Sequence, residues 1–302
     1  MYSLKIRVGT RGSKLALVQT GWVVSELEKA NPDIEFETVI IKTTGDKIIN
    51  VSLDKIGDKG LFVKEIEMRL IDGEIDMAVH SMKDMPAKPV PGLKFTKVPK
   101  REDPRDVLVL RKGLNGLSDL PEGAVIGTGS KRRKYQLLKV RPDLNIVPIR
   151  GNIDTRISKI ETENLDGIVL AASGIIRAGM EDYITEYLSE DIMVPAPAQG
   201  ALAIEIREDD NHMEDIINTI YDEKTQIQVD AERSYLAGID GSCHIPMGAY
   251  CKIDGENIHL TGLFGDENGE KITVKSIEDR CENAKEAGKK LAQMILKEHN
   301  NE

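Results

Sequence analysis

The stretch AVHSMKDMP, residues 78–86, stops an apolar run at a cluster of polar and ionisable side chains. The run before it, Ile75–Val79, is short and nearly all apolar, which is typical of a strand buried on both faces. In open α/β sheets, ligands bind in the crevice outside the carboxyl ends of the strands. The stretch therefore predicts an α/β sheet with a site at this strand end, built from four side chains: His80, Ser81, Lys83 and Asp84.

Two roles are open for Asp84. An ionised carboxylate in a basic crevice can accept hydrogen bonds from N–H groups, stabilise a cation or move a proton. It can equally well cap a turn and pair with the neighbouring Lys83. We interpret His80 as a hydrogen-bonded structural histidine rather than a ligand.

The same strand–turn–helix unit recurs on both sides of this stretch, which favours the α/β class. Apolar runs end at glycine turns, and each turn leads into residues with helical periodicity. The strands predicted in this way are residues 5–8, 36–43, 124–126 and 167–171. Residues 44–65 have no clear period and predict a long mobile loop that acts as a lid.

The pattern changes after residue 222. Segments 257–265 and 271–276 flank the turn sequence DENG and predict a β-hairpin. A final helix places four small or apolar residues on one face, Ala284, Ala287, Leu291 and Ile295. These elements predict a small α+β domain at the C-terminal end.

Composition narrows the class of protein. The chain has 302 residues, 40% of them hydrophobic, which suits two or three domains. We find neither an apolar run of membrane-spanning length nor the apolar core of a signal peptide, and therefore expect a cytoplasmic enzyme or binding protein. The net charge of −10 disfavours nucleic acid, although the basic run Lys131–Lys134 keeps that contact open as a minor alternative.

Arginines gather in the loops that follow the predicted strands. Guanidinium groups bind carboxylates or phosphates in bidentate fashion, and a helix N-terminus adds further affinity for anions. The sequence lacks GxxxxGK[ST] and a dinucleotide fingerprint, so a carboxylate ligand is favoured over a phosphate. For each arginine taken singly, a solvated surface charge is the alternative. The residues concerned are Arg11, Arg132, Arg133, Arg150, Arg156 and Arg177.

The three cysteines, at positions 243, 251 and 281, form no CxxC pair, so we expect free thiols and no zinc site. Cys243 lies between Gly241 and Pro246 in a predicted loop, which suits an accessible nucleophile. The alternative is a small buried hydrophobe, and the contexts of Cys251 and Cys281 fit that alternative.

An ordered set of motifs resembles one family, porphobilinogen deaminase, from near the N-terminus to about Tyr250. The matching stretches include GTRGSKLALVQT, KIGDKGLFVKEIE, AVHSMKDMP, REDPRDV, GTGSKRRKYQL, IRGNIDTRISK, LAASGIIRAG, PAPAQGALAIE and DGSCHIPMGAY. Because they occur in the family's order, the set is far more specific than any single motif.

The resemblance implies two domains like the halves of a periplasmic binding protein, with mixed sheets, and a third that carries the cysteine loop. It implies residues 1–99 with 200–219 as the first domain, 105–194 as the second and 222–302 as the third. It also implies a transferase that condenses four porphobilinogen molecules head to tail onto a covalent dipyrromethane cofactor. Ammonia leaves at each step, and hydrolysis then releases the linear tetrapyrrole hydroxymethylbilane.

Residue roles are implied by matching motif positions. The catalytic group would be Asp84. The cofactor would be held by Cys243 through a thioether and by Lys83, Ser81, Thr128, Ser130, Arg132, Arg133, Arg177 and Gly174. Substrate and growing chain would be bound by Arg11, Ser13, Arg150, Arg156, Gln199 and Gly200, under a lid with Lys55, Lys59 and Phe62.

The family also implies a cytoplasmic monomer whose partners are porphobilinogen and the growing oligopyrrole chain, with no metal, nucleic acid or membrane. A non-enzymatic two-lobed binding module for a small dianion is the alternative function. That module would explain the arginines equally well. It would not explain Cys243 in a glycine loop or the Lys83–Asp84 pair.

Overall fold

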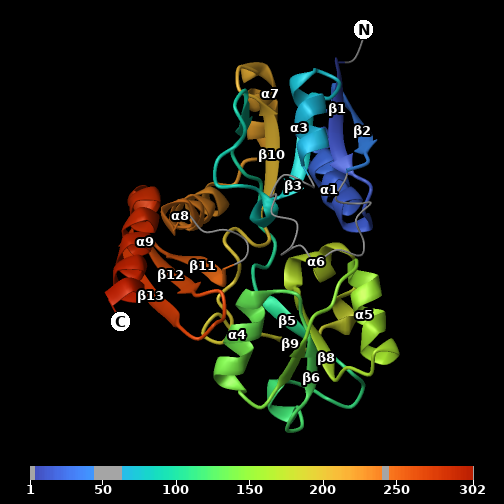
Figure 1. The fold of residues 1–302 in the computed structure, drawn as a ribbon. Coiled ribbons are helices and arrows are strands. Elements are labelled where there is room, and N and C mark those ends of the chain that lie inside the picture. Colours follow the sequence, from blue (N-terminus) through green and yellow to red (C-terminus); the bar gives the residue numbers. More distant parts are fainter. Residues whose placement is uncertain (1–3, 44–62, 240–244, 302) are drawn as a thin grey trace. The chain divides into compact units, whose positions relative to one another are not determined.

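The structure is a computed structural model that describes residues 4–43, 63–239 and 245–301 (Figure 1). The chain divides into two compact units. The first consists of Met1–Arg101 and Ala201–Gln226, and the second of Glu102–Gly200 and Ile227–Glu302. The strands of the described residues form one sheet in the first unit and two in the second.

The first unit is built on a mixed sheet with the order β2-β1-β3-β10-β4. Strand β1 runs parallel to β2 and β3, whereas β10 is antiparallel to β3 and β4. The elements are β1 (Leu4–Arg11), α1 (Lys14–Ala30), β2 (Ile34–Ile41), α3 (Lys64–Ile71), β3 (Met77–Ser81), the turn η2 (Met82–Asp84), β4 (Leu93–Phe95), β10 (Leu202–Arg207), α7 (Asn211–Ile217) and the turn η5 (Asn218–Ile220).

Helix α1 shows how the sequence sets these boundaries. Ser13 has an extended backbone, and its hydroxyl oxygen accepts the Ala16 N–H over 3.3 Å, which is the N-cap that starts the helix. Val23 and Leu27 lie one turn apart on the same face and are fully buried. They pack in one core with Met77 of β3.

The second unit contains a sheet with the same pattern, ordered β7-β6-β8-β5-β9. Strand β6 is parallel to β7 and β8, and β5 is antiparallel to β8 and β9. The elements are β5 (Asp106–Leu110), η3 (Leu117–Asp119), β6 (Val125–Gly127), α4 (Lys131–Val140), β7 (Asn145–Val147), α5 (Ile153–Thr162), β8 (Gly167–Ala171), α6 (Ala172–Arg177), η4 (Glu181–Tyr183) and β9 (Glu186–Tyr187).

The remaining sheet of the second unit is an antiparallel meander, β11-β12-β13. Helices α8 and α9 pack against it around a core that includes Tyr235, Cys251, Leu291 and Ile295. The elements are α8 (Glu223–Ile239), β11 (Met247–Asp254), β12 (Asn257–Gly265), β13 (Ile272–Arg280), η6 (Cys281–Asn283) and α9 (Ala284–Asn301).

The predicted fold class, α/β with mixed sheets and a small α+β C-terminal part, is confirmed. The four strands predicted from apolar runs correspond to β1, β2, β6 and β8, and the predicted hairpin corresponds to β12 and β13. The strand predicted at Ile75–Val79 is displaced, because pairing with β10 extends the ladder through His80 and Ser81. The division into three domains stays a prediction.

Most of the predicted lid, residues 44–62, lies outside the described residues. Helix α3 starts at Lys64, so the last two residues of the segment predicted as a loop are helical. Within the described ranges, no helix combines the length and hydrophobicity that a membrane span requires.

Candidate active site

The turn η2 presents Lys83 and Asp84 at the end of β3. The residues on either side, Met82 and Met85, are each 3% exposed and fill the core. The Met82 N–H donates to the Ala201 carbonyl oxygen over 3.1 Å, which ties the turn to the start of β10. Because both methionines are anchored, Asp84 is left exposed and Lys83 half-buried.

Ser81 and His80 point to opposite faces of the sheet, as consecutive strand residues do. On one face, the Gln19 side-chain amide donates to the Ser81 hydroxyl over 2.9 Å. Gln19 is 6% exposed and was not predicted as a site residue. The signal was available, since Gln19 lies one turn before Val23 on the buried face of α1, where a polar side chain needs a partner.

On the other face, His80 is buried against Glu205 of β10, with its Nε2 3.2 Å from a carboxylate oxygen. The burial agrees with a structural histidine, but the predicted hydrogen bond is not formed at Nε2, because its geometry with Glu205 is not that of a hydrogen bond. Glu67 of α3 is 6% exposed in the same region. Burial raises the pKa of the Glu67 carboxyl, the charge of Glu205 raises it further, and His80 acts in the opposite direction.

Arg11 and Ser13 lie at the same edge of the first sheet as Asp84. Arg11 ends β1 and Ser13 caps α1, and β1 is the parallel neighbour of β3. The carboxyl ends of parallel strands meet at one edge. The first unit therefore gathers five predicted site residues there: Arg11, Ser13, Ser81, Lys83 and Asp84.

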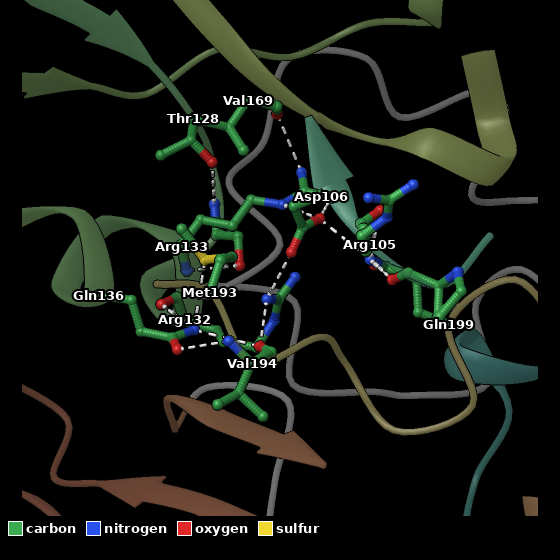
Figure 2. A network of polar contacts seen from close by, with 12 residues as sticks. Arg105, Asp106, Thr128, Arg132, Arg133, Gln136, Val169, Met193, Val194 and Gln199 are labelled. Carbon is green, nitrogen blue, oxygen red and sulfur yellow. Dashed lines mark hydrogen bonds and ion pairs between the residues drawn. The ribbon is translucent and has the colours of Figure 1, made fainter. Parts of the chain in front are cut away.

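In the second unit, the predicted cofactor arginines begin helix α4 and converge on one carboxylate, Asp106 of β5 (Figure 2). Arg132 donates from a terminal nitrogen to Asp106 Oδ2 over 2.7 Å. Arg133 donates from Nε to Asp106 Oδ1 over 3.0 Å. The same two guanidinium groups also donate to carbonyl oxygens, of Val194 and Val169 respectively.

Asp106 is fully buried. Burial alone would raise the pKa of its carboxyl, but Arg132 and Arg133 hold that pKa far below its ordinary value. Two cationic side chains in the first turn of α4 oppose the helix dipole, so their placement needs a compensating charge. Asp106 supplies such a charge to both guanidinium groups, which are of the kind that binds anionic ligands.

The turn before β10 is joined to this network. Gln199 is fully buried, and its amide donates to Asp106 Oδ1 over 3.0 Å and to the Pro104 carbonyl oxygen over 2.7 Å. Arg177, at the end of α6, donates to the Gly200 carbonyl oxygen over 2.7 Å. Burial lowers the pKa of Arg177 to about 10, and Glu102 acts against that shift.

The other predicted residues of the second unit follow its parallel strands β6, β7 and β8. Ser130 caps α4 by accepting the Arg133 N–H, and Thr128 accepts the Ser130 N–H over 3.2 Å. Arg156 donates to the Gly151 carbonyl oxygen over 2.7 Å. The remaining two are Arg150, which is half-buried after β7, and Gly174, which is buried in α6 after β8.

The structure thus assembles one set of predicted residues in each unit. The first presents an exposed carboxylate beside a lysine, and the second presents two guanidinium groups that share the carboxylate of Asp106. Cys243 and the predicted lid residues Lys55, Lys59 and Phe62 lie outside the described residues. Among the residues that are described, His, Cys, Asp and Glu side chains form no group of three suited to a metal.

Two family models match the sequence. Residues 6–215 match the model described as porphobilinogen deaminase, dipyromethane cofactor binding domain. Residues 226–297 match the model for the C-terminal domain of porphobilinogen deaminase. A porphobilinogen deaminase of Clostridioides difficile is 64% identical over 298 residues, which are 99% of each chain. One of Clostridium novyi is 57% identical over 300 residues, covering 98% of this chain and 100% of the relative.

Solved structures give a more distant likeness. A probable extracellular-binding protein of an amino-acid transporter from Bacillus subtilis has a TM-score of 0.44 at 13% identity, covering 72% of this chain and 90% of its own. The periplasmic VFT2 domain of Bordetella pertussis BvgS has a TM-score of 0.41 at 16% identity, covering 72% and 86%.

Proposed function

The chain belongs to the porphobilinogen deaminase family, and we propose that Asp84 is the carboxylate that catalyses its reaction. The reaction condenses four porphobilinogen molecules head to tail on a dipyrromethane cofactor. Ammonia leaves at each step, and the linear tetrapyrrole hydroxymethylbilane is released by hydrolysis. The enzyme is therefore a transferase of tetrapyrrole biosynthesis.

The residues of the second unit fit a group that carries several carboxylates. The observation that carries the proposal is that Arg132 and Arg133 share the single carboxylate of Asp106. Acetate and propionate arms supply anions of the kind that guanidinium groups bind. The dipyrromethane, attached to Cys243, supplies the pyrrole end on which the chain grows.

In each condensation, Asp84 stabilises a cation and later accepts a proton. The C–N bond of the protonated aminomethyl group of porphobilinogen breaks, and neutral ammonia leaves with the bonding electrons. The exposed Asp84 carboxylate stabilises the cation that remains and accepts a hydrogen bond from the pyrrole N–H. When the new C–C bond has formed, Asp84 accepts the proton that the ring carbon loses.

Two groups of residues bind the carboxylate arms in this proposal. The arms of the cofactor are bound by Lys83, Thr128, Ser130, Arg132, Arg133 and Arg177, with Ser81 and Gly174 lining the site. The arms of the substrate and the growing chain are bound by Arg11, Ser13, Arg150 and Arg156, with Gln199 and Gly200 beside them.

We extend the proposal to the organisation of the chain. Three domains are expected, 1–99 with 200–219, 105–194 and 222–302. Lys55, Lys59 and Phe62 belong to a lid over bound substrate. The enzyme acts as a cytoplasmic monomer. Light scattering on the purified protein tests the oligomeric state, and fractionation of the cell tests the location.

Intact-mass measurement of the purified protein tests the cofactor assignment. The wild type should carry the added mass of two linked pyrrole units, and Cys243→Ser should lose it. Cys281→Ser is the matched control, because it replaces another free cysteine and should keep the mass. Wild-type protein that lacks the mass and stays inert with porphobilinogen would remove the basis of the proposal.

Steady-state turnover tests the carboxylate. Asp84→Ala should lower kcat by roughly 100-fold or more, the usual contribution of a general acid or base. Its melting temperature should be unchanged because Asp84 is exposed. Asp33→Ala changes an equally exposed aspartate at the N-terminal end of β2 and should keep full turnover. A near-normal rate for Asp84→Ala would assign the chemistry to another group.

A further inference from the structure

The turn that precedes β10 has a strained backbone. Ala198 has φ +59° and Gly200 has φ +89°, both in the left-handed region. A side chain at Gly200 would meet the Glu102 carbonyl oxygen at 2.3 Å, so glycine is required there. Ala198 has a side chain, and a non-glycine residue keeps this conformation only where its surroundings hold it.

A buried glutamate of helix α8 supplies that hold. Glu232 is fully buried, and its Oε2 accepts the Ala198 N–H over 2.6 Å. Its Oε1 accepts the Cys251 N–H of β11 over 2.9 Å. A single carboxylate therefore fixes the strained turn against the C-terminal sheet, and both of its oxygens are used.

The same turn orients three of the arginines. Gln199, the residue after Ala198, donates to Asp106, which binds Arg132 and Arg133. The next residue, Gly200, accepts a hydrogen bond from Arg177. A shift of the turn at Ala198 would therefore move the partners of all three guanidinium groups together.

We propose that Glu232 is a positioning residue, which sets the orientation of Arg132, Arg133 and Arg177 through the turn at Ala198–Gly200. The inference rests on the proposed role of these arginines in binding carboxylate arms. Its proposed role is exerted through the hydrogen bond to the Ala198 N–H. Helix α8 ends four residues before Cys243 in the sequence, so the element that carries Glu232 also leads into the cofactor attachment point.

Glu232→Gln tests the proposal in the full-length holoenzyme. Glutamine keeps the size of the side chain but has one acceptor oxygen, so its NH2 group would face one of the two backbone donors. We expect the KM for porphobilinogen to rise about tenfold, with a lower fraction of purified protein carrying the dipyrromethane mass. The kcat of the loaded fraction should change much less than KM.

Tyr235→Phe is the matched control, since Tyr235 is also fully buried on α8 and donates to the Leu263 carbonyl oxygen within the C-terminal core. It should lower the melting temperature with an unchanged KM. If Glu232→Gln behaves in the same way, Glu232 is only a stabilising residue and the proposal is overturned.

A second variant, Ala198→Gly, allows the proposal to be tested if Glu232→Gln is poorly folded. Glycine adopts the left-handed conformation without strain, so Ala198→Gly should make the turn less dependent on Glu232. The double variant Glu232→Gln/Ala198→Gly should therefore reverse at least half of the rise in KM, on a logarithmic scale. A double variant whose KM stays as high as that of Glu232→Gln would refute positioning through the turn. If the wild type itself lacked the cofactor mass and turnover, the proposed function would fail. That outcome is distinguishable from failure of the positioning proposal, in which the wild type is active and only the variants behave otherwise than expected.

Discussion

Replacing Asp106 by asparagine should be strongly destabilising. The carboxylate is fully buried and accepts hydrogen bonds from Arg132, Arg133 and Gln199 at 2.7 to 3.0 Å. Asparagine would leave two buried guanidinium groups without their counter-charge. Removing one partner of a buried ion pair costs about 3–5 kcal/mol in the free energy of unfolding. For a domain of this size, each kcal/mol shifts the melting temperature by roughly 2–4 °C, so a fall of about 6–20 °C is expected.

Thermal unfolding followed by circular dichroism measures this shift, with Asp103→Asn as the control. Asp103 lies three residues before Asp106 in the sequence and also pairs with an arginine, Arg105. The Arg105 side chain, however, is 37% exposed. Exposed ion pairs contribute roughly 0–1 kcal/mol, so the control should melt close to the wild type. Equal melting temperatures for the two variants would refute the view that Asp106 compensates the buried charges of Arg132 and Arg133.

Acidification provides an independent check on Asp106. Its carboxyl has a depressed pKa in the folded protein, so the stabilisation is complete above the ordinary value of 3.8 and is lost as the pH falls below it. The wild type should therefore lose stability below pH 3.8 more steeply than Asp106→Asn. Parallel curves for the two proteins would contradict the pairing.

Two other side chains give separate predictions. Since the pKa of Glu67 is raised in the folded protein, its contribution to stability is lost as the pH rises through that pKa, and Glu67→Gln should stabilise most at high pH. Melting curves across the pH range check this, and a gain confined to acid pH, where wild-type Glu67 is already protonated, would contradict it. Gln19→Leu removes the partner of Ser81 and should lower kcat about tenfold with little change in melting temperature. A stability loss with normal kcat would make Gln19 purely structural.

Local pattern was sufficient for much of the fold. The glycine turns after β1 and β6 predicted strand-to-helix junctions, and the apolar spacing of α9 predicted its buried face. The position of Asp84 beyond the C-terminal end of β3 was also predicted, because the apolar run stops just before it. These features depend on neighbours a few residues apart.

The residues that were missed have distant partners. Asp106 lies in the motif REDPRDV, to which the sequence analysis assigned no residue role, and its hydrogen-bond partners Arg132 and Gln199 lie 26 and 93 residues away. Glu232 has the same helical phase as Tyr235, which indicates a buried position but not its partner at Ala198. Such pairs are fixed by tertiary packing, which a single sequence does not reveal. The sequence can still indicate such a residue when a charged side chain occurs at the helical spacing of buried apolar ones, since a buried charge needs a partner.

The placement of β10 has a consequence for synthesis on the ribosome. Strand β4 pairs with β10 in the first sheet, and the Met82 N–H that anchors the Asp84 turn donates to Ala201. At roughly 5–20 residues per second, the ribosome needs about 5–20 s to travel from β4 to β10. During that interval the nascent first sheet has an open edge at β3. A chain stalled before Ala201 would therefore expose the unanchored Asp84 turn to chaperones and proteases.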